Sequence, residues 1–468
     1  MLDIVIKNGK VVHPDRTIET DVGIRDGKVV LLGKAELMPE AARYVDATGK
    51  YVIPGGIDPH THFEDPPFMG AECRADFFQG TRAAAVGGTT TCIDFAVQGN
   101  YGTRLPLDVI GMRLEMARKS AIDYAFHAVV TKNDPETIGQ IQEIINMGIP
   151  SFKCFMTYEA EGIMADDATI LAVMQEMKEH NGIFGAHTEN DSIASRNIRQ
   201  ALAAGKGDAI WHALTKPPLV EAEAINRVLF LAKSTGAAFY DFHMSCKEGV
   251  EMIASARKQG LPVYAETLTH YLVLTQDVLE GPDGPNYICS PPLRTQDHVD
   301  ALWQGIVEGN VHTVGSDDNA FDTKQKRMGG PSFESVPNGI PGAEFRIPVV
   351  FSEGVSKGRI SVNQFVAITS TNAAKILGLY PRKGIIEVGS DADIVLIDPG
   401  IEKTIRVADS SLDLDWTPFE GLKVTGWPSM TISRGKVIVE DGQFKGDAGH
   451  GEFLKRKLPG DINTRQIV

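Results

Sequence analysis

Four histidines, one lysine and one aspartate stand where short apolar segments of the chain end. They are His60, His62, Lys153, His187, His243 and Asp317. Imidazole nitrogens and carboxylates are the ligands that zinc and similar ions take in proteins. His60 and His62 are two residues apart, so on a strand both rings would face the same way. A single histidine at a strand end is usually structural, but the set taken together predicts a metal site.

Eight short apolar segments carry or precede these residues and predict buried strands. They are residues 51–58, 89–96, 123–130, 151–156, 183–187, 238–244, 262–266 and 311–317. Between most of them lie stretches with apolar residues at helical spacing, such as 166–182, with Asp167 as the expected N-cap and Gly182 as the stop. This alternation predicts an α/β fold, a TIM-like (β/α)8 barrel over residues 51–384. Such barrels have their active sites at the carboxyl ends of the strands, which is where the six polar residues are expected to lie.

The two ends of the chain show a different pattern of short strands punctuated by turn signals. The signals that predict hairpins are Asn8-Gly9, Asp26-Gly27, Arg434-Gly435 and Asp441-Gly442. Neither end is long enough to bury a good core alone. We therefore predict one small β-sandwich domain built from residues 1–50 and 385–468, whose tail from residue 449 could reach a neighbouring chain.

Composition narrows the classes of partner. The chain has 468 residues and a formal net charge of −15, which argues against nucleic acid and anionic membranes. The first residues lack the pattern of a signal peptide, and no apolar run is as long as a membrane span. The five cysteines are widely spaced without a CxxC motif, so we expect reduced thiols and a cytoplasmic protein.

Longer strings carry a resemblance that covers nearly the whole chain. They include PGGIDPHTH, SFKCFM, AHTEN, YICSPPLR, VPNGIPG and TSTNAAKILGLYPRKG. With these strings the chain resembles the amidohydrolase superfamily, and within it the dihydropyrimidinase/hydantoinase family of cyclic amidohydrolases. SPPLR together with PNGIPG is more specific than HTH, which the whole superfamily shares. The resemblance implies hydrolysis of dihydropyrimidine or hydantoin rings to N-carbamoyl amino acids.

The resemblance also implies a cofactor. Two divalent metal ions, usually zinc, would be bridged by Lys153 after its carboxylation by CO2. The more buried ion would be held by His60 and His62, with Asp317 as a further ligand. The more exposed ion would be held by His187 and His243. An unmodified ammonium could not bind two cations, so this role requires the carbamate.

The remaining roles that the resemblance implies concern the substrate. Tyr158 would donate to the carbonyl oxygen of the substrate, and the main-chain groups at Ser290 and Asn338 would hold the cyclic amide. A hydroxide that bridges the metals would attack the ring, and Asp317 would take its proton and return it to the leaving nitrogen. Members of the family are commonly tetramers, so a homotetramer or homodimer is expected.

Three departures from the family pattern leave the exact substrate open. Asp318 stands where a histidine usually follows the catalytic aspartate, and the TYEAEGIM loop differs from the usual one. Glu64 stands where dihydroorotases have an arginine, which argues against that activity. An allantoinase or another cyclic amidase of the superfamily remains an alternative. A non-catalytic scaffold is a further alternative, although every predicted ligand is present. His127 and His270, near strand ends, are candidates to support the ligands.

Overall fold

A parallel barrel forms the centre of the computed structural model, which describes residues 1–98 and 104–458. Its eight strands follow one another in chain order around the sheet. They are β8 (Gly56–Thr61), β9 (Thr89–Val97), β10 (Asp123–Val129), β11 (Ser151–Phe155), β12 (Ile183–His187), β13 (Ala238–Asp241), β14 (Val263–Leu268) and β15 (Thr313–Gly315). The ring closes just beyond β15, where Asp317 N donates to His60 O at 2.9 Å and His62 N donates to Asp318 O at 2.9 Å. The predicted barrel is therefore confirmed.

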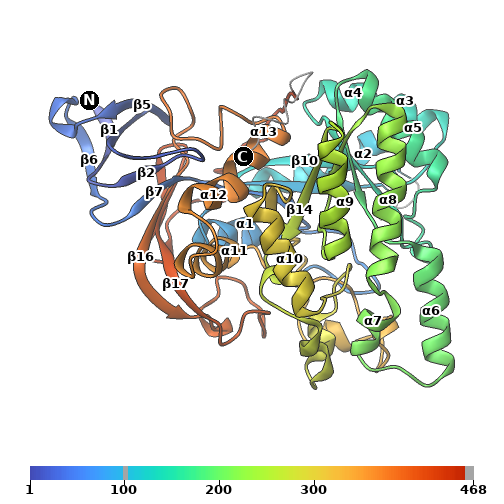
Figure 1. Cartoon of the computed structure of the whole chain (residues 1–468). Coiled ribbons are helices and arrows are strands. Elements are labelled where there is room, and N and C mark those ends of the chain that lie inside the picture. Colours follow the sequence, from blue (N-terminus) through green and yellow to red (C-terminus); the bar gives the residue numbers. More distant parts are fainter. Residues whose placement is uncertain (99–103, 459–468) are drawn as a thin grey trace.

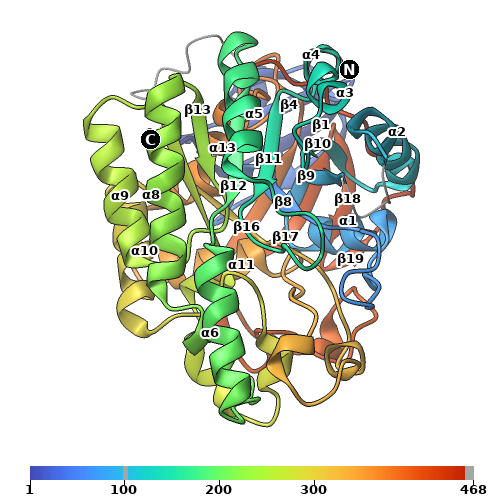
Figure 2. The same cartoon turned by 90° about the vertical axis from the view of Figure 1, so that its right-hand side faces the viewer.

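Helices connect the strands and cover the outside of the barrel, as Figures 1 and 2 show. They are α1 (Phe77–Val86), α2 (Pro106–Met116), α3 (Pro135–Gly139), α4 (Ile141–Asn146), α5 (Asp167–Glu179), α6 (Asp191–Ala203), α7 (Ile210–Thr215), α8 (Pro218–Thr235), α9 (Lys247–Lys258) and α10 (Gln296–Val307). After β15 the chain forms α11 (Arg346–Val350), α12 (Val362–Val366) and α13 (Asn372–Ile376), linked by the π-helical turns η8 (Phe351–Ser356) and η9 (Ala367–Thr371). Within the described ranges, no helix has the length and apolar character needed to cross a bilayer.

The two ends of the chain form two further sheets beside the barrel, on the left of Figure 1. One contains β5 (Lys28–Gly33), β4 (Asp21–Arg25), β1 (Leu2–Lys7) and β6 (Ala41–Asp46). The other contains β19 (Gln443–Phe444), β18 (Lys436–Glu440), β17 (Lys423–Ser433), β16 (Ile394–Thr404), β7 (Tyr51–Pro54), β2 (Lys10–Val12) and β3 (Thr17–Glu19). Side chains from both sheets share one apolar core, which includes Ile6, Ile24, Ile394 and Ile432. The prediction of a sandwich made from both ends is confirmed.

Three local expectations from the sequence are wrong in detail. Asn8-Gly9 does not close a hairpin, because β1 and β2 enter different sheets. The glycine is needed there for close packing, since a Cβ would collide with the side chains of Val52 and Ala47. Residues 51–54, expected in the first barrel strand, pair with β2 and β16 instead. Helix α5 has Asp166 as its N-cap and ends at Glu179, not at Gly182. The other three turn signals do join paired strands.

The C-terminal tail packs on its own chain as far as residue 458. Leu454 is fully buried, and its backbone N–H donates to Tyr124 O at 2.8 Å. The Arg456 side chain is also buried and donates to Ser151 Oγ at 2.7 Å. Residues 449–458 therefore lie against their own chain, and the contact of the tail with a neighbouring chain stays a prediction. Residues 459–468 lie outside the described part of the chain.

A buried lysine joins the barrel to the terminal sheets. Lys383 Nζ lies 2.5 Å from Asp123 at the start of β10, 2.5 Å from Asp393 and 3.0 Å from Asp391. Three carboxylates so close together could hold a metal ion, but here the ammonium group stands among them. All four side chains are almost completely buried. The cluster is therefore an ion network that fixes how the two parts of the chain meet.

We predict that Lys383→Met destabilises the fold by about 3–5 kcal/mol, because it leaves the buried carboxylate of Asp393 without its counter-charge. Thermal and denaturant unfolding would measure the loss. The matched control is Lys436→Met, which removes a lysine 2.5 Å from Asp447 on the surface. Exposed pairs contribute about 0–1 kcal/mol, so this variant should unfold like the parent. Equal effects of the two substitutions would contradict the structural role of Lys383.

Candidate active site

A pocket opens at the carboxyl ends of the barrel strands. Its lining includes every predicted catalytic, substrate-binding and metal-binding residue except His60, which lies buried beneath it. These lining residues are His62, Lys153, Tyr158, His187, His243, Ser290, Asp317 and Asn338. The apolar part of the wall is formed by Phe68, Val97, Phe155 and Ile163. Segments that are far apart in the sequence thus meet at one mouth, as parallel strands of a barrel require.

His60, His62 and Asp317 form the tightest group of possible metal ligands. Asp317 Oδ1 lies 3.1 Å from His60 Nε2 and 3.3 Å from His62 Nε2. The two ring nitrogens are themselves 3.3 Å apart. Two imidazoles and a carboxylate that converge in this way match the donor set of a zinc-type ion.

His187 and His243 pack edge to face in the wall of the same pocket. Their ring centroids are 4.4 Å apart. His243 Nδ1 is buried, and the described residues offer it no hydrogen-bond partner. A buried ring nitrogen without a partner is costly, and a bound cation would satisfy it. This pair therefore fits a second ion beside the first group.

Lys153 lies between the two groups in aromatic surroundings. Its Nζ stands 4.3 Å from the ring centroid of Phe95 and 4.7 Å from those of Phe155 and Phe242. It lies 3.4 Å from His60 Nε2, and within the described part of the chain it forms no ion pair with a carboxylate. Burial lowers the pKa of Lys153 to about 8, so part of the amine is neutral near neutral pH. A neutral amine can react with CO2, whereas an ammonium group cannot.

Three carboxylates behind the histidines fix the rings, and sequence reasoning did not identify them. Glu266 Oε1 lies 2.6 Å from His60 Nδ1, Asp65 Oδ2 lies 2.8 Å from His62 Nδ1, and Glu189 Oε2 lies 2.7 Å from His187 Nε2. Such partners orient metal-binding histidines and raise their basicity. Two of these carboxylates could have been found from the sequence. Glu266 ends the predicted seventh strand, and Glu189 follows His187 by two residues.

Several ionisable groups of the site have strongly shifted pKa values when no metal is bound. Although burial opposes it, the hydrogen bonds to Asp317 and Asp65 raise the pKa of His62 to about 9. Burial also opposes the charge of Asp317, yet His60 and His62 hold the pKa of its carboxyl well below its usual range. Burial and the nearby His187 hold the pKa of His243 well below its usual range, so this ring stays neutral. A cation that binds His62 must displace its proton, so metal binding is expected to weaken as the pH falls.

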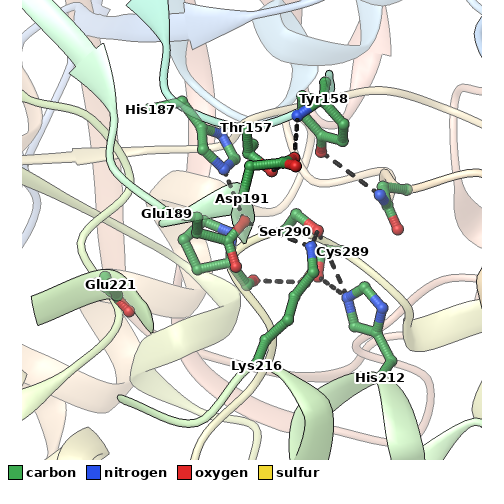
Figure 3. A network of polar contacts seen from close by, with 12 residues as sticks. Thr157, Tyr158, His187, Glu189, Asp191, His212, Lys216, Glu221, Cys289 and Ser290 are labelled. Atoms are coloured by element: carbon green, nitrogen blue, oxygen red, sulfur yellow. Dashed lines mark hydrogen bonds and ion pairs between the residues drawn. The ribbon is translucent and has the colours of Figure 1, made fainter. Parts of the chain in front are cut away.

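Tyr158 points its hydroxyl group toward the other predicted substrate-binding residues. Asn338 Nδ2 donates to Tyr158 Oη at 3.4 Å, and Ser290 lines the same pocket. Burial, followed by the charge of Glu189, raises the pKa of Tyr158, so the phenol keeps its proton and remains a donor. Lys216 Nζ donates to Ser290 Oγ at 2.9 Å and lies 3.5 Å from Glu189 Oε2 (Figure 3). Sequence reasoning missed Lys216, which joins the metal side of the pocket to the substrate side.

Two residues that depart from the family pattern lie away from the pocket lining. Asp318 is fully buried, and its Oδ2 accepts from Gly342 N at 2.7 Å and from Ala343 N at 2.9 Å. Glu64 accepts from the backbone of Phe77 and pairs with Lys119 at 2.8 Å. Asp318 thus braces the loop that carries Asn338 and does not touch the substrate space directly.

The two histidines named as possible supports differ in position. His127 is buried with Ser151 Oγ at 2.7 Å from Nδ1 and Pro59 O at 3.0 Å from Nε2, so it packs beneath the site. His270 lines the pocket, with its Nε2 3.9 Å from the Cys289 sulfur.

Comparison with known proteins gives a consistent result. The model of the amidohydrolase family matches residues 51–438. A D-hydantoinase from Geobacillus stearothermophilus is 43% identical over 99% of this chain and 98% of its own length. The crystal structure of a dihydropyrimidinase from Brevibacillus agri superposes with a TM-score of 0.94 at 43% identity, covering 97% of this chain and 99% of that one. An L-hydantoinase from Arthrobacter aurescens superposes with a TM-score of 0.91 at 31% identity, covering 97% of this chain and 100% of that one. The chain therefore belongs to the amidohydrolase family, and within it to the group of hydantoinases and dihydropyrimidinases.

Proposed function

We propose that this protein hydrolyses a cyclic ureide, a dihydropyrimidine or hydantoin ring, to an N-carbamoyl amino acid. One observation carries the proposal: a cluster of possible cation ligands shares a pocket with the hydrogen-bond donor Tyr158. The chain has the same fold as relatives that are named hydantoinases. In the reaction a C–O bond forms at the ring carbonyl carbon and the ring C–N bond breaks. The single open-chain product carries a new carboxylate and a terminal ureido group.

The proposed cofactor is a pair of divalent metal ions, most simply zinc. His60, His62 and Asp317 would hold one ion, and His187 and His243 the other. Lys153 would bridge them as a carbamate, which replaces a positive group by a negative one with two oxygen donors. When bound, such ions lower the pKa of a water ligand and supply a nucleophile at neutral pH.

The side chains of the pocket would perform the proton transfers and the binding. Asp317 would accept the proton of the attacking water and return it to the ring nitrogen as the C–N bond breaks. The Tyr158 hydroxyl group would donate to the carbonyl oxygen as negative charge develops on it. Main-chain groups at Ser290 and Asn338 would hold the ring amide in place. The raised pKa of Tyr158 supports its role as a donor, because the phenol keeps its proton.

A substrate panel with metal analysis of the same sample tests the proposal. We expect turnover of dihydrouracil, hydantoin or 5-substituted hydantoins, with about two divalent ions per chain. Removal of the metal with a chelator should abolish turnover, and adding zinc should restore it. Preference for allantoin would favour the alternative activity, and a protein that binds no metal and turns over none of these rings would contradict the proposal.

We predict that Lys153→Ala loses most of its metal and its activity, because the bridging oxygens disappear. A short carboxylic acid should restore part of the activity by occupying the same space. Metal content per chain, turnover, and the carbamate signal in 13C NMR after incubation with labelled bicarbonate measure the outcome. Cys154→Ala, at the neighbouring buried position, is the control. An unmodified lysine amine beside two bound ions would contradict this assignment.

Asp317 and Asp318 form a natural matched pair for a second test. Asp317→Asn keeps the shape but cannot accept a proton, so kcat should fall about 100-fold or more while much of the metal is retained. Asp318→Asn changes an adjacent carboxylate that faces the 342–343 backbone instead. It should keep its metal and most of its kcat. Loss of metal from the Asp318 variant with normal turnover of the Asp317 variant would show that the wrong carboxylate was assigned.

We also propose that the protein is a cytoplasmic homotetramer or homodimer. The family resemblance supports the assembly, and the five free cysteines agree with a reducing compartment. Sedimentation of the metal-loaded protein would test the assembly directly.

A further inference from the structure

The backbone at Tyr158 adopts a conformation that needs external support. Tyr158 follows β11 in a loop and has a φ of 71°, in the left-handed region. A bulky residue rarely takes this conformation, because its Cβ crowds the following carbonyl group. Such strain persists only where the surrounding structure over-determines it. Something must therefore hold this residue in place.

The carboxylate of Asp191 supports the backbone of Tyr158 directly. Its Oδ1 accepts a hydrogen bond from Tyr158 N at 3.0 Å and another from Thr157 Oγ1 at 3.1 Å (Figure 3). Its Oδ2 accepts from Ser195 Oγ at 3.1 Å, one turn further along α6. Both oxygens are thus engaged, and the side chain links the start of a helix to the turn that aims the phenol.

Asp191 belongs to the same short segment that places a predicted metal ligand. His187 ends β12, Glu189 holds the ring of His187, and Asn190 caps α6 by accepting from Ile193 N. Asp191 then opens that helix. One stretch of five residues therefore fixes both a histidine of the metal group and the backbone of the tyrosine that faces it across the pocket.

We propose that Asp191 is the positioning residue of Tyr158. By holding the backbone of the tyrosine in the left-handed conformation, it keeps the phenol aimed at the place where the substrate carbonyl binds. The inference rests on the proposed function, in which Tyr158 donates to the developing oxyanion. It extends that function to a residue that lies outside the lining of the main pocket.

A double-mutant cycle on the metal-loaded, full-length protein tests this inference. Tyr158→Phe removes the donor and should lower kcat about 100-fold or more. Asp191→Ala should lower kcat about tenfold or more, because small misplacements of a catalytic group are costly. In the Tyr158→Phe background, Asp191→Ala should cause no further loss of kcat, since the group it positions is absent. Additive losses would overturn the proposal.

Conservative and matched variants separate positioning from a general effect on folding. Asp191→Asn keeps a carbonyl oxygen for the backbone of Tyr158, so it should retain kcat within about threefold. The serine side chain of Asp191→Ser is too short to reach that N–H group, so this variant should behave like Asp191→Ala. It replaces Asp191→Ala in the test if the alanine variant folds poorly. Asp167→Ala removes the first residue of α5, a carboxylate that pairs with Arg227 on the surface at 2.9 Å. It should leave kcat and metal content unchanged.

A readout that does not need activity tests the loop itself. Chymotrypsin should cleave after Tyr158 faster in Asp191→Ala than in the parent or in Asp167→Ala, because the turn is no longer held. Metal content should be equal in all of these variants. If the parent protein hydrolysed no cyclic ureide, the proposed function would fail while the proteolysis result still decided the role of Asp191. Unchanged cleavage together with unchanged kcat would overturn that role.

Discussion

Charged groups buried at the mouth of the barrel must be compensated locally, because water cannot reach them freely. Lys153 is surrounded by three aromatic rings and two histidine groups, without a carboxylate in ion-pair contact among the described residues. The carboxylates are placed one step further out, where each holds one ring of the site. Lys153 and Asp317 thus lie at the centre of the mouth, and the carboxylates that hold the histidine rings lie around them.

The remaining architecture follows from the need to bring these groups together. His60, Lys153 and His187 lie on three parallel strands of one barrel, β8, β11 and β12, so the sheet alone brings their Cα atoms to one edge. The final orientation comes from the loops, in which His243, Asp317 and Tyr158 all have positive φ angles. Three strained residues therefore lie at the site, where precise orientation matters most. Regular elements set the approximate positions, and carboxylate hydrogen bonds from neighbouring segments set the rest.

The sequence predicted the elements better than it predicted their partners. Apolar segments and helical spacing were enough to place the barrel strands, and the polar residues at their ends pointed to one mouth. The hairpin predicted at Asn8-Gly9 was wrong, because a turn signal is local, whereas the sheet that a strand joins depends on distant residues. Residues 51–54 were assigned to the barrel for the same reason. The orientation of Asp318 could not be inferred either, because its backbone partners at 342 and 343 lie in a loop of irregular conformation.

The strand β7 pairs directly with β16, more than 300 residues later in the chain. During synthesis, β7 leaves the ribosome long before this partner exists, so one of its edges stays unpaired until then. Non-local pairings of this kind slow folding, and until they form they leave apolar surface and strand edges exposed to aggregation. The barrel strands, by contrast, pair with their neighbours in order of synthesis. The sheet that begins with β2, β3 and β7 is therefore completed only by the segment from β16 onward.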